Sequence, residues 1–141
     1  MYSILVPIDG SKQARHALKH VIKSSTQGLQ AEIHVLNVQP IILPLGEFPL
    51  INADLIEKAQ QIEAKKLLKS ACALLEKAEL KYIQHAETGP IARTIVDYAK
   101  THACDSIVMG SRGMGAFANL VLGSIANQVV HLTDIPVTLV K

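Results

Sequence analysis

Ile4-Leu5-Val6-Pro7-Ile8-Asp9-Gly10-Ser11 is the stretch that decides the fold. Its first five residues form a short apolar run with β-branched side chains, which predicts a central parallel strand buried on both faces. The run ends at Asp9-Gly10-Ser11, where Asp9 or Ser11 can cap a following helix. Apolar residues then recur at helical spacing, at Ala14, Ala17, Leu18, Val21 and Ile22. The chain therefore opens with a buried strand and a helix that packs one face on the sheet.

Strands and helices alternate along the rest of the chain. Further strands are predicted at residues 31–38, 81–87, 105–109 and 136–140, with residues 81–87 as a half-exposed edge strand. Helices are predicted at residues 52–78 and 124–132, and a third is opened by Thr88-Gly89-Pro90 and runs to residue 99. This alternation predicts a single doubly wound α/β domain, with a five-stranded parallel sheet and helices on both faces.

The composition fits one globular domain. Of 141 residues, 49% are hydrophobic and 18% are charged, which excludes intrinsic disorder. The formal net charge is only +2, from 14 basic and 12 acidic residues, and does not indicate the strongly basic surface of a nucleic-acid-binding protein. No apolar run reaches the ~20 residues of a membrane span, and no secretory signal precedes the first strand. We therefore expect a soluble cytoplasmic protein without nucleic-acid or membrane partners.

An apolar loop separates the second strand from the second helix. Residues 39–51 carry three prolines, and a lid, a partner contact and packing on the same domain are all open interpretations. Leu55, Ala59 and Ile62 lie opposite the main apolar stripe of the following helix. The first turns of that helix are therefore expected to meet a different surface, either the loop or a partner chain.

The motif richest in chemistry is Gly110-Ser111-Arg112-Gly113, followed after nine residues by Gly123-Ser124. In open α/β sheets, ligands bind beyond the carboxyl ends of the strands, where the strand order reverses. Glycines there let backbone N–H groups approach an anion, and Gly123-Ser124 stands where a helix N-terminus adds partial positive charge. The pattern predicts a phosphate cradle, with a tight turn as the alternative. Asp9 is the one acid placed nearby, either as a helix cap or as a ligand-binding group.

Other candidate sites have less support. A dinucleotide-binding fingerprint is matched by Gly113-Met114-Gly115-Ala116-Phe117-Ala118, but such a site carries this motif after the first strand of the domain. The sequence contains no P-loop motif with its lysine. His16 and His20 stand four residues apart on a helix, yet no third metal ligand is in sight. The remaining histidines share no spacing, so no catalytic triad can be assigned. Cys72 and Cys104 lie outside any Cys-x-x-Cys spacing, which predicts buried thiols.

The whole chain resembles the universal stress protein family, whose ATP-binding members carry Gly-two-Gly-nine-Gly-Ser/Thr after the fourth strand. The resemblance includes the opening strand and its Asp9-Gly10-Ser11 turn, and the block from Ile107 to Gly113. It extends to Leu122-Gly123-Ser124-Ile125-Ala126 and the closing Pro136-Val137-Thr138-Leu139-Val140. The resemblance implies the strand order 3-2-1-4-5, with ATP lying across the ends of strands 1, 2 and 4.

The resemblance also implies roles for individual residues. Pro7, Ile8 and Asp9 would line the ribose and adenine end, with Asp9 accepting from a ribose hydroxyl, and the Val38 backbone would read the adenine edge. The ribose and phosphates would be wrapped by Met109, Gly110, Arg112, Gly113, Gly123, Ser124 and Ile125. ATP would carry Mg²⁺ or Mn²⁺ on its phosphates.

The function implied by the resemblance is that of an ATP-binding regulator or sensor of the stress response. In the implied strand order the last strand, Pro136-Val137-Thr138-Leu139-Val140, lies at a sheet edge, so we expect a two-fold dimer through it, with an edge shielded by its own helix as the alternative. The sequence shows no obvious catalytic base near Gly123, so we expect ATP binding rather than catalysis. A slow ATP hydrolase or adenylyl-transferring enzyme is one alternative. An interaction module without nucleotide is the other.

Overall fold

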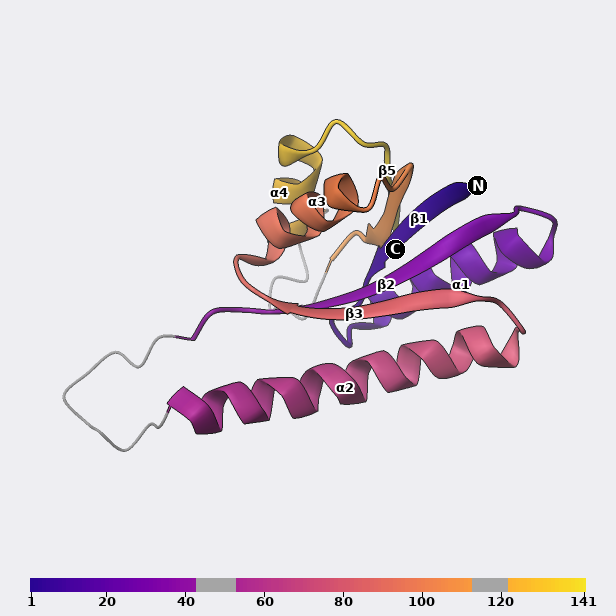
Figure 1. The fold of residues 1–141 in the computed structure, drawn as a ribbon. Coiled ribbons are helices and arrows are strands. Elements are labelled where there is room, and N and C mark those ends of the chain that lie inside the picture. The colour runs from indigo at the N-terminus through magenta and orange to yellow at the C-terminus, as the bar shows by residue number, and fades with distance from the viewer. Residues whose placement is uncertain (43–52, 113–121) are drawn as a thin grey trace.

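A computed structural model of the chain describes residues 1–42, 53–112 and 122–141. Strands and helices alternate throughout these ranges (Figure 1). The elements are β1 (Tyr2–Pro7), α1 (Lys12–Thr26), β2 (Ala31–Gln39), α2 (Ala53–Lys77), β3 (Tyr82–Thr88), α3 (Ile91–Thr101), β4 (Ser106–Gly110), α4 (Ser124–Leu132) and β5 (Val137–Val140).

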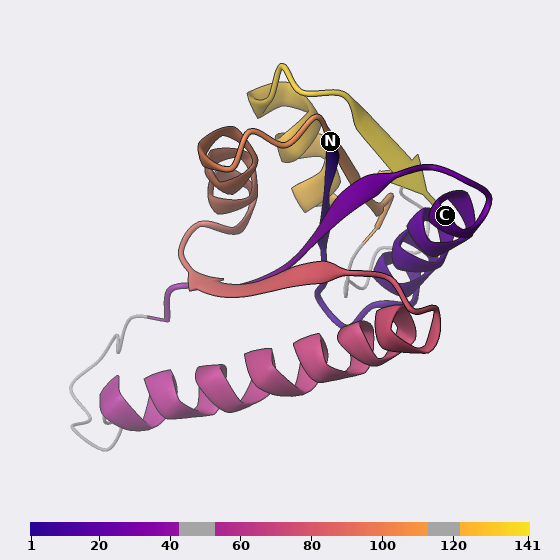
Figure 2. The ribbon, with the colours of Figure 1, turned by 45° about the vertical axis from the view of Figure 1, so that its right-hand side comes forward.

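The five strands form one parallel sheet in the order β3-β2-β1-β4-β5, which confirms the predicted fold class. β1 lies at the centre, paired with β2 from Tyr2 opposite Ala31 to Pro7 opposite Leu36. Helices α1 and α2 cover one face of the sheet, and α3 and α4 cover the other (Figure 2). β3 stands at one edge, as its alternating sequence predicts.

The alternating side chains of β1 supply both hydrophobic cores. Ile4 and Val6 pack with the buried residues of α1 and α2, whereas Leu5 packs with those of α3 and α4. All three side chains are buried, and each such burial contributes about 1.5–3 kcal/mol. The central strand therefore holds the two helix layers together across the sheet.

Several element boundaries differ from the predicted ones. β1 ends at Pro7 rather than Ile8, although the Ile8 N–H still donates to the Leu36 carbonyl at 2.7 Å. The strand predicted at residues 105–109 instead runs from Ser106 to Gly110, because Gly110 still pairs with Val140 as the last residue of β4. Helix α1 is capped by Ser11, whose Oγ accepts from the Ala14 N–H at 3.1 Å.

Helix α2 begins with turns that bury little against the described residues. Its first buried residue is Ala64, and Leu55 and Ile62 are 62% and 68% exposed. These turns extend past the end of the sheet in Figure 1. The apolar loop that was expected to meet them lies outside the described residues from position 43 onward. None of the helices in residues 1–42, 53–112 and 122–141 is both long and apolar enough to cross a membrane.

Gly110 lets helix α1 approach the end of β4. A Cβ atom on Gly110 would lie 2.8 Å from the Gln13 carbonyl carbon and 2.9 Å from the Ala14 nitrogen. Both are backbone atoms of the first turn of α1, which cannot move away without shifting the helix. Steric packing therefore requires glycine at this position, in addition to any contact with a ligand.

We expect Gly110→Ala to lower the free energy of unfolding by about 1–3 kcal/mol, the usual cost of overpacking. Urea denaturation measures this loss. Gly89→Ala is the matched control, since its Cβ would meet only the Thr94 side chain, which can rotate away. Equal stability of Gly110→Ala and the wild type would contradict the close packing of α1 on β4.

Candidate functional site

A pocket opens at the carboxyl ends of β1, β2 and β4, where the strand order reverses. Most of the residues selected from the sequence line it, namely Pro7, Ile8, Asp9, Val38, Met109, Gly110, Arg112 and Ile125. Gly123 and Ser124 are not among the lining residues but begin α4, whose next residues line the pocket. Gly113 lies outside the described residues. The topology thus gathers residues from both ends of the chain.

Helices complete the walls of the pocket with residues that sequence analysis missed. Ile91 and Ile95 come from α3, Ala126 from α4 and Ala14 from α1. Their apolar side chains belong to the helix faces that pack on the sheet, so the sequence marks them only as core. The pocket is consequently apolar in its walls and polar at the Asp9 turn and at Arg112.

The turn after β1 holds Asp9 at the mouth of the pocket. One carboxylate oxygen of Asp9 accepts from the Ser11 N–H at 2.9 Å. Gly10 between them has φ +84°, and a Cβ there would lie 2.8 Å from a methyl carbon of Leu67. The left-handed conformation therefore favours glycine at this position, whereas the Leu67 side chain can rotate away from a Cβ. Asp9 itself is exposed, so its carboxylate can serve the turn and a ligand together.

The end of β2 carries a buried polar residue that sequence analysis also missed. Asn37 is 1% exposed, and its Nδ2 donates to the Ile8 carbonyl at 2.7 Å. Its Oδ1 accepts from Nε2 of Gln39 at 2.9 Å. The one signal in the sequence is an amide within the apolar run Val35-Leu36-Asn37-Val38. Asn37 thereby ties the chain after β1 to the end of β2.

Backbone bonds bring the start of α4 to the end of β4. The Ser111 N–H donates to the Val140 carbonyl at 2.8 Å, and the Gly123 N–H donates to the Ser111 carbonyl at 2.7 Å. Gly123 is the N-cap of α4 and supplies no side-chain cap. The first N–H groups of a helix lack partners within it and carry partial positive charge, which favours an anion. The predicted position of Gly123 and Ser124 at a helix N-terminus is confirmed.

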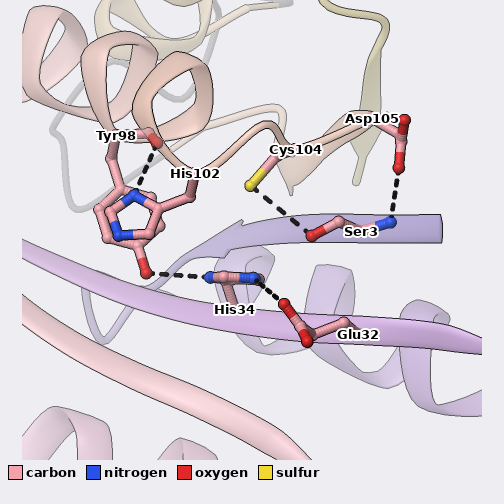
Figure 3. A network of polar contacts seen from close by, with 7 residues as sticks. All are labelled: Ser3, Glu32, His34, Tyr98, His102, Cys104 and Asp105. Carbon is pink, nitrogen blue, oxygen red and sulfur yellow. Dashed lines mark hydrogen bonds and ion pairs between the residues drawn. The ribbon is translucent and has the colours of Figure 1, made fainter. Parts of the chain in front are cut away.

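A second polar cluster, which the sequence did not predict, centres on His34 (Figure 3). His34 is 3% exposed, with Nε2 at 2.8 Å from Glu32 Oε1 and Nδ1 at 3.0 Å from the Tyr98 hydroxyl. Because a carboxylate only accepts, Nε2 carries a proton, and in the neutral ring Nδ1 then accepts from the Tyr98 hydroxyl. His102 stacks on Tyr98 with ring centroids 3.8 Å apart. This cluster links α3 to β2 through satisfied hydrogen bonds.

Both cysteines are free and buried, as predicted. Burial raises the pKa of the Cys72 and Cys104 thiols above their ordinary value. Cys104 lies 4.0 Å from the Ser3 hydroxyl, and Cys72 lies 3.6 Å from an amide oxygen of Gln84. A raised pKa keeps a thiol protonated and a poor nucleophile at neutral pH. Neither cysteine therefore has the character of a catalytic residue.

No group of three metal-binding side chains comes together within the described ranges. In particular, His16 and His20 gain no third ligand there. His16 instead places Nδ1 at 2.9 Å from the backbone oxygen of Lys141, which follows β5. One histidine of the pair on α1 therefore contacts the residue that follows β5.

Comparisons with known proteins agree on one family. The model of the universal stress protein family matches residues 1–141. The chain is 33% identical over 143 residues to universal stress protein MJ0531 of Methanocaldococcus jannaschii, covering 98% of this chain and 81% of the relative. It is similar in structure to universal stress protein UspA from Lactobacillus plantarum, with TM-score 0.84, 25% identity and coverage of 99% and 97%. The universal stress protein from Archaeoglobus fulgidus in complex with dAMP shares the fold, with TM-score 0.71, 23% identity and coverage of 100% and 98%.

We expect the free energy of unfolding to fall as the pH rises above about 9. The pKa values of both thiols and of Tyr98 are raised chiefly by burial, and that of Tyr82 is raised chiefly by its hydrogen bond to Glu76. The unfolded chain therefore loses these protons at a lower pH than the folded chain, which favours unfolding in alkali. Below about pH 8 both states keep the protons and this contribution to the pH dependence vanishes.

Urea midpoints at pH 7.5 and pH 10 measure the effect. Cys104→Ala removes one of the titrating groups, so its midpoint should fall less between the two pH values than that of the wild type. A wild-type midpoint that is the same at both pH values would contradict the raised pKa values.

Proposed function

We propose that this chain, which belongs to the universal stress protein family, binds ATP in the pocket at the ends of β1, β2 and β4. The observation that carries the proposal is the composition of that pocket. Apolar walls, a carboxylate and an arginine line it, and the N-terminus of α4 begins next to it. These are the features that a base, a ribose and a chain of phosphates require together. The Archaeoglobus fulgidus structure with dAMP supports an adenine nucleotide as a ligand for this fold.

The base would lie against the apolar walls. Ile91 and Ile95 of α3 line the pocket together with Val38 of the sheet, and a planar base can be buried against such apolar surfaces. Pro7 and Ile8 line the pocket from the end of β1. The backbone of Val38, the last buried residue of β2, would meet the hydrogen-bonding edge of the adenine.

The ribose and phosphates would lie toward the turn after β1 and toward α4. Asp9 would accept from a ribose hydroxyl with a carboxylate that the Ser11 N–H already orients. Gly110, Arg112 and Ile125 line the neighbouring side, and Gly113 is proposed there from the motif alone. Gly123 and Ser124 would hold the outer phosphates at the N-terminus of α4. Mg²⁺ or Mn²⁺ would be carried by the phosphate oxygens.

Binding rather than turnover is the role that we propose, in a regulator or sensor of the stress response. Hydrolysis of ATP needs a group that orients water beside the γ-phosphate. Among the described residues that line the pocket, Asp9 is the one carboxylate and no histidine is present. Asp9 lies at the ribose end in this arrangement.

We further propose that the protein forms a two-fold dimer through β5. The carbonyls of Pro136 and Val140 accept from the N–H groups of Ile107 in β4 and of Ser111 just after it, at 2.9 and 2.8 Å. Backbone groups alternate in direction along a strand, so those of Val137 and Leu139 point away from β4, at the edge of the sheet. Such an edge pairs readily with another strand, and pairing of the same strand from two copies gives a closed dimer.

We expect wild-type protein to bind ATP in calorimetry and Asp9→Ala to weaken that binding by about 1–3 kcal/mol, because a hydrogen bond to a charged group is lost. Asp9→Asn is the control for stability, since its amide oxygen can still accept from the Ser11 N–H. If Asp9→Ala lowers the melting temperature and leaves the ATP affinity unchanged, Asp9 serves only the turn. Absence of binding in folded wild-type protein would refute the proposed function.

We expect the wild type to sediment as a dimer at micromolar concentration and Leu139→Pro to sediment as a monomer. Proline at position 139 removes an N–H that points outward, whereas the bonds from β5 to β4 involve Pro136 and Val140. Leu139→Ala is the matched control, because it shortens the side chain and keeps the N–H. A monomeric wild type would exclude the dimer.

A further inference from the structure

The chain just beyond β1 is held to β2 by an unusual pair of hydrogen bonds. The Ile8 N–H donates to the backbone carbonyl of Leu36 at 2.7 Å. The Ile8 carbonyl, in contrast, accepts from the side-chain Nδ2 of Asn37, also at 2.7 Å. The Ile8 N–H thus continues the backbone pairing of the sheet, whereas the Ile8 carbonyl is bound by a side chain.

In regular parallel pairing, a different group would donate to the Ile8 carbonyl. β1 and β2 are paired up to Pro7 opposite Leu36, so the same register would set Ile8 opposite Asn37. A residue in that position donates to the residue before its partner and accepts from the residue after it. The regular donor to the Ile8 carbonyl is therefore the Val38 N–H. The Asn37 side chain occupies the place of that donor.

The surroundings of Asn37 show that this arrangement is specific. Asn37 is buried and stands between two apolar residues in the sequence of the strand, and a buried amide is unfavourable unless its polar atoms are bonded. The Ile8 carbonyl can only accept, so Nδ2 must face it, and Oδ1 then faces the donor Nε2 of Gln39 at 2.9 Å. Both polar ends of the amide are satisfied in one orientation only.

We infer that Asn37 is a positioning residue that prevents the backbone pairing of β1 and β2 from continuing to Val38. By binding the Ile8 carbonyl, it leaves the Val38 N–H directed into the pocket, which Ile8, Leu36 and Val38 all line. A backbone N–H so placed offers a hydrogen bond to an acceptor nitrogen of a heterocyclic base. The identity of that ligand rests on the proposed function, whereas the open Val38 N–H is a property of the chain alone.

Amide hydrogen exchange of the nucleotide-free, full-length protein, followed by NMR, tests the inference directly. Leu36 and Val38 direct their backbone groups to the same side, but only Leu36 lies within the β1–β2 pairing. We expect the Val38 amide to exchange at least about tenfold faster than the Leu36 amide. Equal protection of the two amides would overturn the inference, and this measurement requires no variant to fold.

Asn37→Ala then tests the consequence for binding. Without the side-chain amide, the Ile8 carbonyl is expected to take the Val38 N–H, so that exchange at Val38 slows and ATP binds about tenfold or more weakly. Gln39→Ala is the matched control, since it removes the other bond of the same amide and leaves the Ile8 contact. Leu75→Ala, buried on the α2 side of the sheet, controls for lost stability. Wild-type ATP affinity in folded Asn37→Ala would refute the role of Asn37 in binding.

The two proposals fail in different ways. If Val38 exchanges rapidly and ATP neither binds nor slows that exchange, the nucleotide proposal is wrong and the role of Asn37 in the ladder stands. If ATP binds while Val38 is protected in the free protein, the nucleotide proposal stands and the inference about Asn37 is wrong.

Discussion

The structure depends on the burial of β1 from both sides. Leu5 packs into the core under α3 and α4, and Ile4 and Val6 pack into the core under α1 and α2. A strand in this position can contain almost no polar side chains, and its neighbours must be parallel strands joined by helices on both faces. The central place of β1, between β2 and β4, follows from this burial. The crevice at its carboxyl end follows as well, because α1 leaves β1 on one face and α4 follows β4 on the other.

The pocket forms where regular pairing between strands ends. Beyond Pro7, the chain is held by one backbone bond and by the Asn37 side chain, and beyond Gly110 it is held by the Ser111 bonds to Val140 and Gly123. Backbone N–H groups at such a position are close to the solvent yet fixed in direction, which suits ligand binding. Gly110 contributes by letting α1 come close to β4, so that Ala14 forms part of the wall. The rigid core and the binding surface thus share the same residues.

Local sequence patterns predicted the main features of this arrangement. The apolar run from Ile4 to Ile8, the turn at Asp9-Gly10-Ser11 and the glycines around position 110 each act over a few residues, so spacing alone reveals them. The bounds that were predicted therefore lie within one or two residues of the observed ones, whereas the assignment of residues from three strand ends to one site came from the resemblance to the universal stress protein family. Asn37 and His34 could not be assigned in this way. Their partners Ile8 and Tyr98 lie 29 and 64 residues away in the chain, and no periodicity links such pairs.

The amino-acid sequence by itself determined which segments become strands and helices, and which loops follow the strands. These outcomes depend on hydrophobic periodicity and on the conformational limits of glycine and proline, which are local properties. Only the tertiary structure decided the partner of each buried polar group and the walls of the pocket. Ile91, Ile95 and Ala126 are ordinary core residues until α3 and α4 pack beside β2 and β4. Asn37 is an isolated amide until β1 lies next to it. A hydrogen bond requires two groups to be close in space, and the order of residues in the sequence does not show which distant groups come together.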